Sequence, residues 1–288
     1  MKKKLSFGAI AVLLLLSLIL YFILPAPEPV PAVSLDQVAA YAGEPYAILN
    51  GNVPLFTQEE LTEESYEYYG DLDRLNRCTY TMASIGRDLM PTEERGSIGQ
   101  VKPTGWMTAK YDFVDGKYLY NRCHLIGFQL TGENANEANL ITGTRYMNVE
   151  GMLPFENMVA DYVKETGNHV LYRVVPVFEG DNLVASGVTI EALSVEDNGE
   201  GICFYVYIYN VQPGVEIDYT TGESQLAATV TEADENVTTY VVNISSKKFH
   251  DGDCSQADSI KAENREIFET TRSQMIAWSF SPAGCCKP

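Results

Sequence analysis

Three segments of the chain, 78–86, 169–180 and 201–211, are rich in β-branched and aromatic residues, a composition typical of sheet strands. Residues 155–166 instead carry apolar side chains at spacings of three and four, which predicts an amphipathic helix with Pro154 in its first turn. We therefore expect a sheet with at least one long helix. The apolar face of that helix comprises Phe155, Met158, Val159, Tyr162 and Val163.

Polar positions mark turns and boundaries elsewhere. Asn50 and Gly51 lie between two apolar runs in 46–56, which predicts a tight hairpin at the start of the folded part. Residues 223–239 are polar and acidic without periodicity, and we interpret them as a linker. A small unit, residues 240–288, follows, and 260–278 is its expected helix.

The N-terminal segment 1–24 contains a continuous uncharged stretch, in contrast to the periodic apolar positions of the predicted helix. Three lysines precede an uncharged stretch from Leu5 to Leu24, which as a helix would span about 30 Å, the thickness of a bilayer core. This favours an uncleaved, single-pass cell-membrane anchor with everything after it outside the cytoplasm. A cleaved signal peptide, and thus secretion, is the alternative. Four prolines make 25–34 an extended spacer before a folded domain at 35–222.

The net charge of the chain and its distribution limit the classes of partner that the protein can bind. The net charge is −19, which opposes binding to a polyanion unless the charge is uneven or metal ions intervene. It is uneven, because residues 101–180 carry seven Lys and Arg against nine Asp and Glu. The middle of the chain is therefore nearly neutral, and its flanks are acidic.

His124 is one of three histidines, and it lies in "YNRCHLIGFQL". A histidine beside Arg122 is either a buried structural imidazole or a general base held neutral near a cation. Downstream, Asn139, Asn148 and Glu156 offer hard oxygen ligands of the kind that Mg²⁺ selects. Histidine together with oxygen donors favours metal-assisted hydrolysis.

"YNRCHLIGFQL" resembles the Asp-Arg-Gly-His motif of the DNA/RNA non-specific endonucleases, in particular the streptococcal secreted DNases, and "NLITGTRYMNVEGMLPFE" extends the resemblance. It covers roughly residues 75–210. It implies an α+β fold, in which a ββα-metal nuclease core lies on a mostly antiparallel β-sheet. It also implies an Mg²⁺-dependent endonuclease, with Mn²⁺ as a substitute ion, that cleaves DNA without base preference, with RNA as a further expected substrate.

The resemblance assigns roles residue by residue. His124 corresponds to the general base, Arg122 to the phosphate-binding arginine and Asn148 to the ligand of a single Mg²⁺ ion. Asn139 corresponds to an asparagine that orients the site, and Glu156 to a glutamate that binds metal-bound water. Arg95 in the preceding loop is a second phosphate contact or, equally, a solvent-facing arginine.

Two departures from the motif keep alternatives open. Asn121 replaces the aspartate, and Cys123 replaces the glycine. They favour, as the alternative, an inactive surface protein that binds nucleic acid on the same scaffold. A Cys123 thiol hydrolase is a third reading, but neighbours on a strand point to opposite faces, so it needs a partner such as His169.

The C-terminal unit resembles the small metal-binding domain of the Ada repair protein, through "KKFHDGDCSQAD" and "SPAGCCKP". The resemblance implies zinc bound by His250, Cys254, Cys286 and Cys285, although Ala283 stands where the first cysteine of the terminal pair is expected. The alternative is a zinc-free unit with a disulfide from Cys254 to a terminal cysteine, which would stabilise it by roughly 2–4 kcal/mol.

Overall fold

The computed structural model describes Val33 and residues 35–227, 237–278 and 280–286. Residue contacts divide the chain into two units, Met1–Ala32 and Val33–Pro288. The expected membrane anchor over 1–24 lies outside the described residues. Among the residues that are described, none of the helices has both the length and the apolar character needed to cross a membrane.

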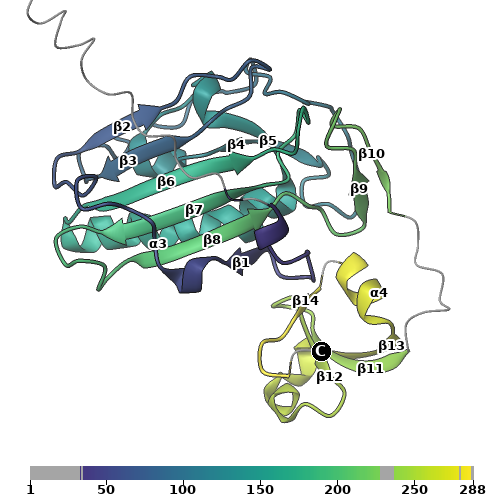
Figure 1. Ribbon diagram of the computed structural model, residues 1–288. Coiled ribbons are helices and arrows are strands. Elements are labelled where there is room, and N and C mark those ends of the chain that lie inside the picture. Colours follow the sequence, from purple (N-terminus) through teal and green to yellow (C-terminus); the bar gives the residue numbers. More distant parts are fainter. Residues whose placement is uncertain (1–32, 34, 228–236, 279, 287–288) are drawn as a thin grey trace, which may run out of the picture. The chain divides into compact units, whose positions relative to one another are not determined.

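An antiparallel six-stranded sheet forms the body of the domain that carries the histidine motif (Figure 1). The three predicted strand segments supply β3, β6 and β8. The central strands are buried along nearly their whole length, which explains their continuous apolar composition. The order is β1 (Tyr46–Ile48), β8 (Cys203–Tyr209), β7 (Gly187–Ser194), β6 (Val170–Val177), β3 (Thr81–Ile85) and β2 (Tyr66–Tyr69).

A β-hairpin and a helix cover one face of this sheet. The hairpin consists of β4 (Tyr120–His124) and β5 (Leu140–Thr144), paired antiparallel, and the helix is α3 (Leu153–Thr166). Figure 1 shows α3 lying along the back of the sheet. Side chains from β4, β5 and α3 share one apolar core with the sheet. The α+β fold with a mostly antiparallel sheet is thus confirmed, and the core fixes the strand that carries the motif.

The predicted helix is present, and a π-helix, Met147–Met152, leads directly into it. Pro154 lies in the first turn of α3, as predicted, and Phe155, Val159 and Val163 are buried. Met158 is 49% exposed, so its place on the buried face is wrong, and Ala160 is buried instead. Since Asn148 lies in the π-helix and Glu156 in α3, no single regular α-helix connects them.

The opposite face of the sheet is covered by the start of the domain. Three tyrosines of β8, at 205, 207 and 209, form a second apolar cluster with Leu49 and Val177. Val33, Leu35, Val38 and Tyr41 pack against this cluster. Apolar packing therefore covers both faces of the sheet. The ends of the sheet and the loops around β4 are the parts left to bind a ligand.

The hairpin predicted over 46–56 is wrong. Asn50 and Gly51 do have positive φ angles, of 45° and 61°, but they form a short 3₁₀ turn, Asn50–Asn52. No strand follows over 53–57; β1 pairs instead with β8, more than 150 residues later in the chain. A second hairpin, β9 (Val215–Ile217) with β10 (Ser224–Leu226), extends regular structure into the segment interpreted as a linker.

The C-terminal unit contains its own four-stranded sheet. Most of the helix expected over 260–278 is wrong, because Arg265–Thr270 forms strand β13 along β11, and only α4 (Arg272–Ala277) is α-helical. Pairing with a neighbouring strand outweighs the local helix propensity here. The strand order is β13 (Arg265–Thr270), β11 (Thr238–Asn243), β12 (Lys248–Asp251) and β14 (Ser281–Pro282).

Candidate active site and Cys/His cluster

The His124 ring is held between two partners. Its Nε2 lies 2.8 Å from the backbone oxygen of Asn134, and its Nδ1 lies 3.2 Å from Nη2 of Arg95. A carbonyl only accepts and a guanidinium only donates, so Nε2 carries the proton and Nδ1 the lone pair. Burial, with the Arg95 cation adding to it, lowers the pKa of His124 to about 4, although the Asn134 bond acts in the opposite direction. The imidazole is therefore neutral near pH 7.

Arg122 projects from the same strand two residues earlier and is fixed by the preceding loop. Its Nε donates to the carbonyl of Val101, and its Nη2 donates to Gly99 O at 3.0 Å. Its guanidinium also stacks on Trp106, 3.9 Å from the ring centroid. Among the described residues, none accepts a hydrogen bond from Nη1, so this edge of the fork can bind an anion.

Glu156 approaches the motif from α3. Its carboxylate lies so close to Gly127 that a side chain at that position would collide with it. Burial raises the pKa of Glu156 to about 7, against the lowering effects of the Gln129 hydrogen bond and the Arg95 cation. Arg95 thus acts electrostatically on both His124 and Glu156, and the structure brings these three predicted residues together.

Asn148 lies in the π-helix, beside the first residue of the motif. Its Nδ2 donates to Oδ1 of Asn121 at 3.4 Å. The same Asn121 oxygen accepts from Nη1 of Arg145 at 3.2 Å. No described residue donates to Oδ1 of Asn148 or connects it by a hydrogen bond to His124. Its amide oxygen therefore remains available to a cation.

Asn139 is fully buried and binds only backbone. Its Oδ1 accepts from the Ile126 amide at 2.9 Å, and its Nδ2 donates to the Ile126 carbonyl at 3.0 Å. The Asn139 carbonyl also accepts from the Leu125 amide. This clamp fixes the chain that leaves β4 immediately after His124, and it leaves the Asn139 side chain no direct part in binding a ligand.

Cys123 points into the core, as strand alternation requires. It is fully buried, and burial raises the pKa of its thiol well above the usual range. His169, its only suggested partner, binds Glu196 at 2.7 Å and Ser65 at 3.2 Å instead. This geometry gives a thiol nucleophile no base and no access to substrate.

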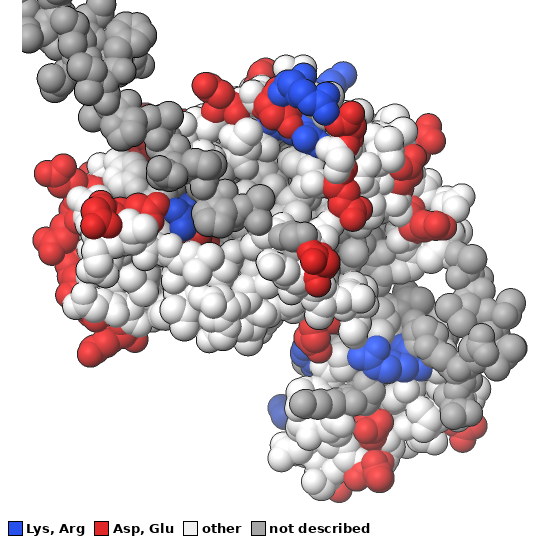
Figure 2. Space-filling view, in the orientation of Figure 1, with Lys and Arg blue, Asp and Glu red and all other residues white. Residues whose placement is uncertain are grey.

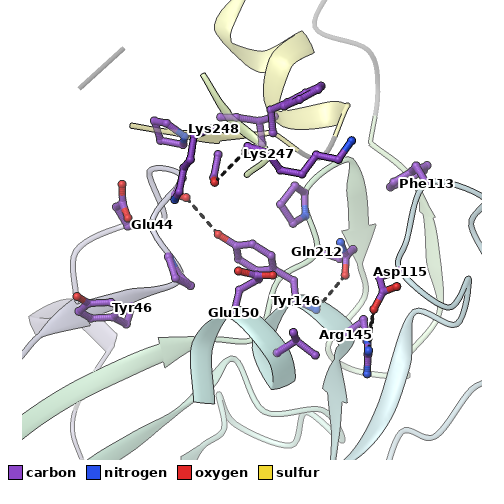
Figure 3. Close-up of a pocket in the computed structure, with 18 of the residues that line it drawn as sticks. Glu44, Tyr46, Phe113, Asp115, Arg145, Tyr146, Glu150, Gln212, Lys247 and Lys248 are labelled. Carbon is purple, nitrogen blue, oxygen red and sulfur yellow. Dashed lines mark hydrogen bonds and ion pairs between the residues drawn. The ribbon is translucent and has the colours of Figure 1, made fainter. Parts of the chain in front are cut away.

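Three contributors to the site were missed by the sequence reasoning. The contact from Asn134 is made by its backbone carbonyl, and because every residue type has one, the sequence does not predict this contact. Trp106 could have been suspected from its aromatic ring in the loop before the motif. Arg145 lies three residues before Asn148, and this helical spacing was a usable signal. Figure 3 shows Arg145 directed at Asp115, with which it forms an ion pair.

The charge on the surface is consistent with a site that depends on a few local cations. On the face shown in Figure 2, acidic side chains are spread along the edges, while basic side chains occur in small groups. Next to β4, Arg95 contacts His124, and Arg122 projects from the strand itself. These two cations are suited to bind a polyanion locally.

The C-terminal unit brings His250, Cys254, Cys285 and Cys286 together, the four residues named from the sequence. Their ligand atoms all lie within 4.8 Å of one another. The sulfur of Cys254 is 3.7 Å from that of Cys285, which in turn is 3.8 Å from that of Cys286. These sulfur separations exceed a disulfide bond of about 2.05 Å. All six cysteines are free, so the alternative disulfide is not formed.

The topology of this unit explains how adjacent cysteines both reach the cluster. Strand β14 runs parallel to β12 and carries the chain end past His250. Ala283 donates its amide to Phe249 O at 2.9 Å and is 6% exposed, so its side chain belongs to the packing of the unit. The two cysteines that follow Gly284 supply the sulfur atoms instead.

Comparisons with known proteins agree with this fold. Residues 57–196 match the family described as DNA/RNA non-specific endonuclease. A curated protein named "Deoxyribonuclease" from Streptococcus dysgalactiae subsp. equisimilis is 31% identical over 123 residues, which are 41% of this chain and 36% of that protein. The chain thus spans about a third of the length of this relative.

Two solved structures are similar in fold. NucA from Streptococcus agalactiae, with a magnesium ion bound, has a TM-score of 0.58 and 25% identity; the match covers 65% of this chain and 89% of NucA. Sda1 nuclease, with a bound zinc ion, has a TM-score of 0.53 and 23% identity, covering 68% and 100%. Residues 57–196 thus match the DNA/RNA non-specific endonuclease family, and the histidine motif lies within this match on a fold similar to that of NucA.

Proposed function

We propose that this protein is a metal-dependent non-specific endonuclease that hydrolyses phosphodiester bonds of DNA and, as a second substrate, of RNA. The observation that carries the proposal is the His124 ring. The Asn134 carbonyl fixes its tautomer, and burial keeps it neutral, so Nδ1 carries a lone pair that accepts from Arg95 until that guanidinium turns to a bound phosphate. A neutral imidazole in the motif of a nuclease family is suited to take a proton from water.

Arg95 and Arg122 are suited to bind the phosphate. In the free protein Arg95 donates to His124 Nδ1, so its guanidinium already lies where a phosphate next to the base would be bound. Arg122 has its Nε and Nη2 engaged by carbonyls and is rigid, which lowers the entropy cost of binding through its remaining edge. Both contacts involve phosphate alone, so cleavage is expected to be independent of base sequence.

Asn148 is the proposed ligand of one Mg²⁺ ion, with Mn²⁺ as a substitute. The fit rests on its amide oxygen, to which no described residue donates, and on the hard oxygen donors that Mg²⁺ prefers. NucA was crystallised with magnesium bound. When bound, the ion supplies positive charge that stabilises the phosphate and the leaving 3′ oxygen. Glu156 is suited to accept hydrogen bonds from water molecules bound to this ion.

The cellular setting follows from the N-terminal segment. We infer a single-pass anchor at 1–24 and a nuclease domain outside the cytoplasmic membrane, with secretion after cleavage as the alternative. Protease treatment of intact cells tests this inference. Digestion of the domain together with recovery of the chain in the membrane fraction supports an anchor, and recovery in the medium supports secretion.

Replacement of His124 by alanine tests the proposed base. Cleavage of circular, linear and single-stranded DNA and of RNA is measured in Mg²⁺ and in EDTA. We expect His124→Ala to lower the rate about 10²- to 10⁴-fold, the usual contribution of a general base. His169→Ala is the matched control, because His169 is also hydrogen-bonded and partly buried but lies away from the motif. Thermal unfolding shows whether each variant is folded.

Two outcomes contradict the proposal. If folded His124→Ala cleaves as fast as the wild type, His124 is not the base. If the wild type binds DNA but cleaves nothing with Mg²⁺ or Mn²⁺, the chain is the inactive binding protein that Asn121 and Cys123 suggested.

We further propose that His250, Cys254, Cys285 and Cys286 bind zinc. Tetrahedral zinc–sulfur bonds of about 2.3 Å place two sulfurs about 3.8 Å apart. The two sulfur separations of 3.7 and 3.8 Å match this geometry. The Nδ1 atom of His250 lies 3.6, 3.3 and 3.9 Å from the three sulfurs, in chain order, again close to tetrahedral edges. Metal analysis of the purified chain tests this assignment, with one zinc per chain as the expected result.

A further inference from the structure

Asn121, the residue that departs from the aspartate of the motif, accepts two hydrogen bonds through one oxygen. Asn148 donates its Nδ2 to this oxygen at 3.4 Å, and Arg145 donates its Nη1 at 3.2 Å. The two donors come from the π-helix and from the residues just before it, whereas Asn121 lies on β4. Asn121 therefore connects the motif strand to the helix that carries the proposed metal ligand.

Arg145 is itself fixed on its other edge. Its Nε and Nη2 both donate to Oδ2 of Asp115, at 3.0 and 2.7 Å (Figure 3). The Arg145 side chain is 35% exposed, and that of Asp115 is 76% exposed, so the ion pair lies at the surface and serves mainly to orient the guanidinium. A continuous chain of contacts thus runs from Asp115 through Arg145 and Asn121 to Asn148.

This chain fixes which end of the Asn148 amide is presented to a ligand. With Nδ2 bonded to the Asn121 oxygen, Oδ1 of Asn148 must point away from it. A flipped amide would set two carbonyl oxygens against each other, while Arg145 holds the Asn121 oxygen in place. Only the unflipped amide offers an oxygen, the atom that a hard divalent cation requires.

We propose that Asn121 is a positioning residue for Asn148, held in turn by Arg145 and Asp115. The inference rests on the proposed function, since it assumes that Asn148 binds the divalent cation. It also explains the departure from the motif. Because Asp115 already neutralises Arg145, an uncharged acceptor at position 121 is sufficient, and a carboxylate there could accept the same two hydrogen bonds.

The test is Mn²⁺ affinity of the full-length chain, measured by electron paramagnetic resonance of the free ion without substrate. Chains are first stripped of metal and then reloaded with one equivalent of zinc. We expect Asn121→Ala to weaken Mn²⁺ binding about 10- to 100-fold, as loss of a partner behind a metal ligand usually does. Asn121→Asp should remain within about threefold of the wild type, because it keeps an acceptor oxygen at this position. Asn168→Ala, which removes another partly buried asparagine, is the matched control and should leave the affinity unchanged.

Cleavage rates separate a positioning role from a merely structural one. At saturating Mn²⁺, Asn121→Ala should recover to within about fivefold of the wild-type rate, because the ion itself then holds Asn148 in place. If Asn121→Ala does not fold, Arg145→Met decides, with an expected loss of about 3- to 10-fold in Mn²⁺ affinity.

The outcomes distinguish this inference from the proposed function. If the wild type cleaves DNA but Asn121→Ala, or Arg145→Met in its place, binds Mn²⁺ as tightly as the wild type, the positioning role is wrong and the nuclease assignment stands. If the wild type cleaves nothing, yet Mn²⁺ affinity depends on Asn121 as expected, the positioning role stands and the nuclease assignment fails.

Discussion

The two candidate metal sites of this protein differ in how much of a coordination sphere the chain provides. In the nuclease domain, Asn148 offers one amide oxygen, and its neighbours Asn121 and Arg145 orient that oxygen without adding ligands. In the C-terminal unit, one nitrogen and three sulfur atoms lie within 4.8 Å of one another. In the first arrangement, water and substrate would occupy most coordination positions of a bound ion. In the second, protein atoms would occupy all four positions of a tetrahedral ion.

This difference indicates different tasks. A cation that keeps open positions can reach a phosphate, which is what hydrolysis requires, and hard oxygen donors select Mg²⁺ for it. Thiolates and an imidazole with no open position select zinc and hold a fold together. The two sites should therefore respond differently to metal removal, to substitution and to pH.

The largest expected effect is that of metal removal. EDTA should abolish cleavage entirely, and dialysis into Mg²⁺ alone should restore it, even though the zinc proposed for the C-terminal cluster is not replaced. The reason is that the ion proposed at Asn148 would have a single protein ligand and would exchange readily, whereas no residue proposed for the reaction belongs to the Cys/His cluster. Cleavage assays paired with metal analysis of the same samples provide the measurement. Recovery only after zinc is added would show that the two sites are not independent.

The second effect concerns the cluster alone. Cys254→Ser should reduce bound zinc from one equivalent to none and lower the thermal stability of the C-terminal unit, because three ligands do not close a structural site. Cleavage should stay within about twofold of the wild type, since no residue proposed for the reaction is altered. Cys203→Ser, an exposed cysteine outside the cluster, is the control and should keep its zinc. A large loss of cleavage in Cys254→Ser would assign the cluster a part in the reaction.

Much of both sites was predictable because it depends on residue identity. His124 and Glu156 were named from the motif resemblance, and they lie near each other because β4 and α3 pack on one core. The four residues of the Cys/His cluster were named in full. What the sequence did not predict is how the adjacent Cys285 and Cys286 both reach the cluster, because that depends on how β14 lies against β12.

What was missed depends on tertiary contacts. The Asn134 carbonyl that fixes the tautomer of His124 is a backbone atom and leaves no trace in the sequence. The hairpin at Asn50 failed although its φ angles were right, because β1 finds its partner in β8, far along the chain. The helix over 260–278 failed because β11 offered Arg265–Thr270 a strand partner. Local propensity is outweighed where a strand distant in sequence forms hydrogen bonds with the backbone N–H and C=O groups.

The last effect we expect is on the pH dependence of cleavage, and it again separates the two sites. In the roles proposed here, cleavage requires His124 to be neutral and Glu156 to be ionised. The pKa of His124 is lowered to about 4 and that of Glu156 is raised to about 7, each chiefly by burial. As pH falls from 8.5 to 5.5, His124 stays neutral while Glu156 takes up a proton, so the rate at subsaturating Mg²⁺ should fall about 30-fold. Glu156→Gln should be slower but flat across this range, and Cys254→Ser should retain the wild-type profile. An acidic limb near pH 6.5 that survives in Glu156→Gln would instead assign the titration to an unshifted His124, and the neutral, buried base would then be wrong.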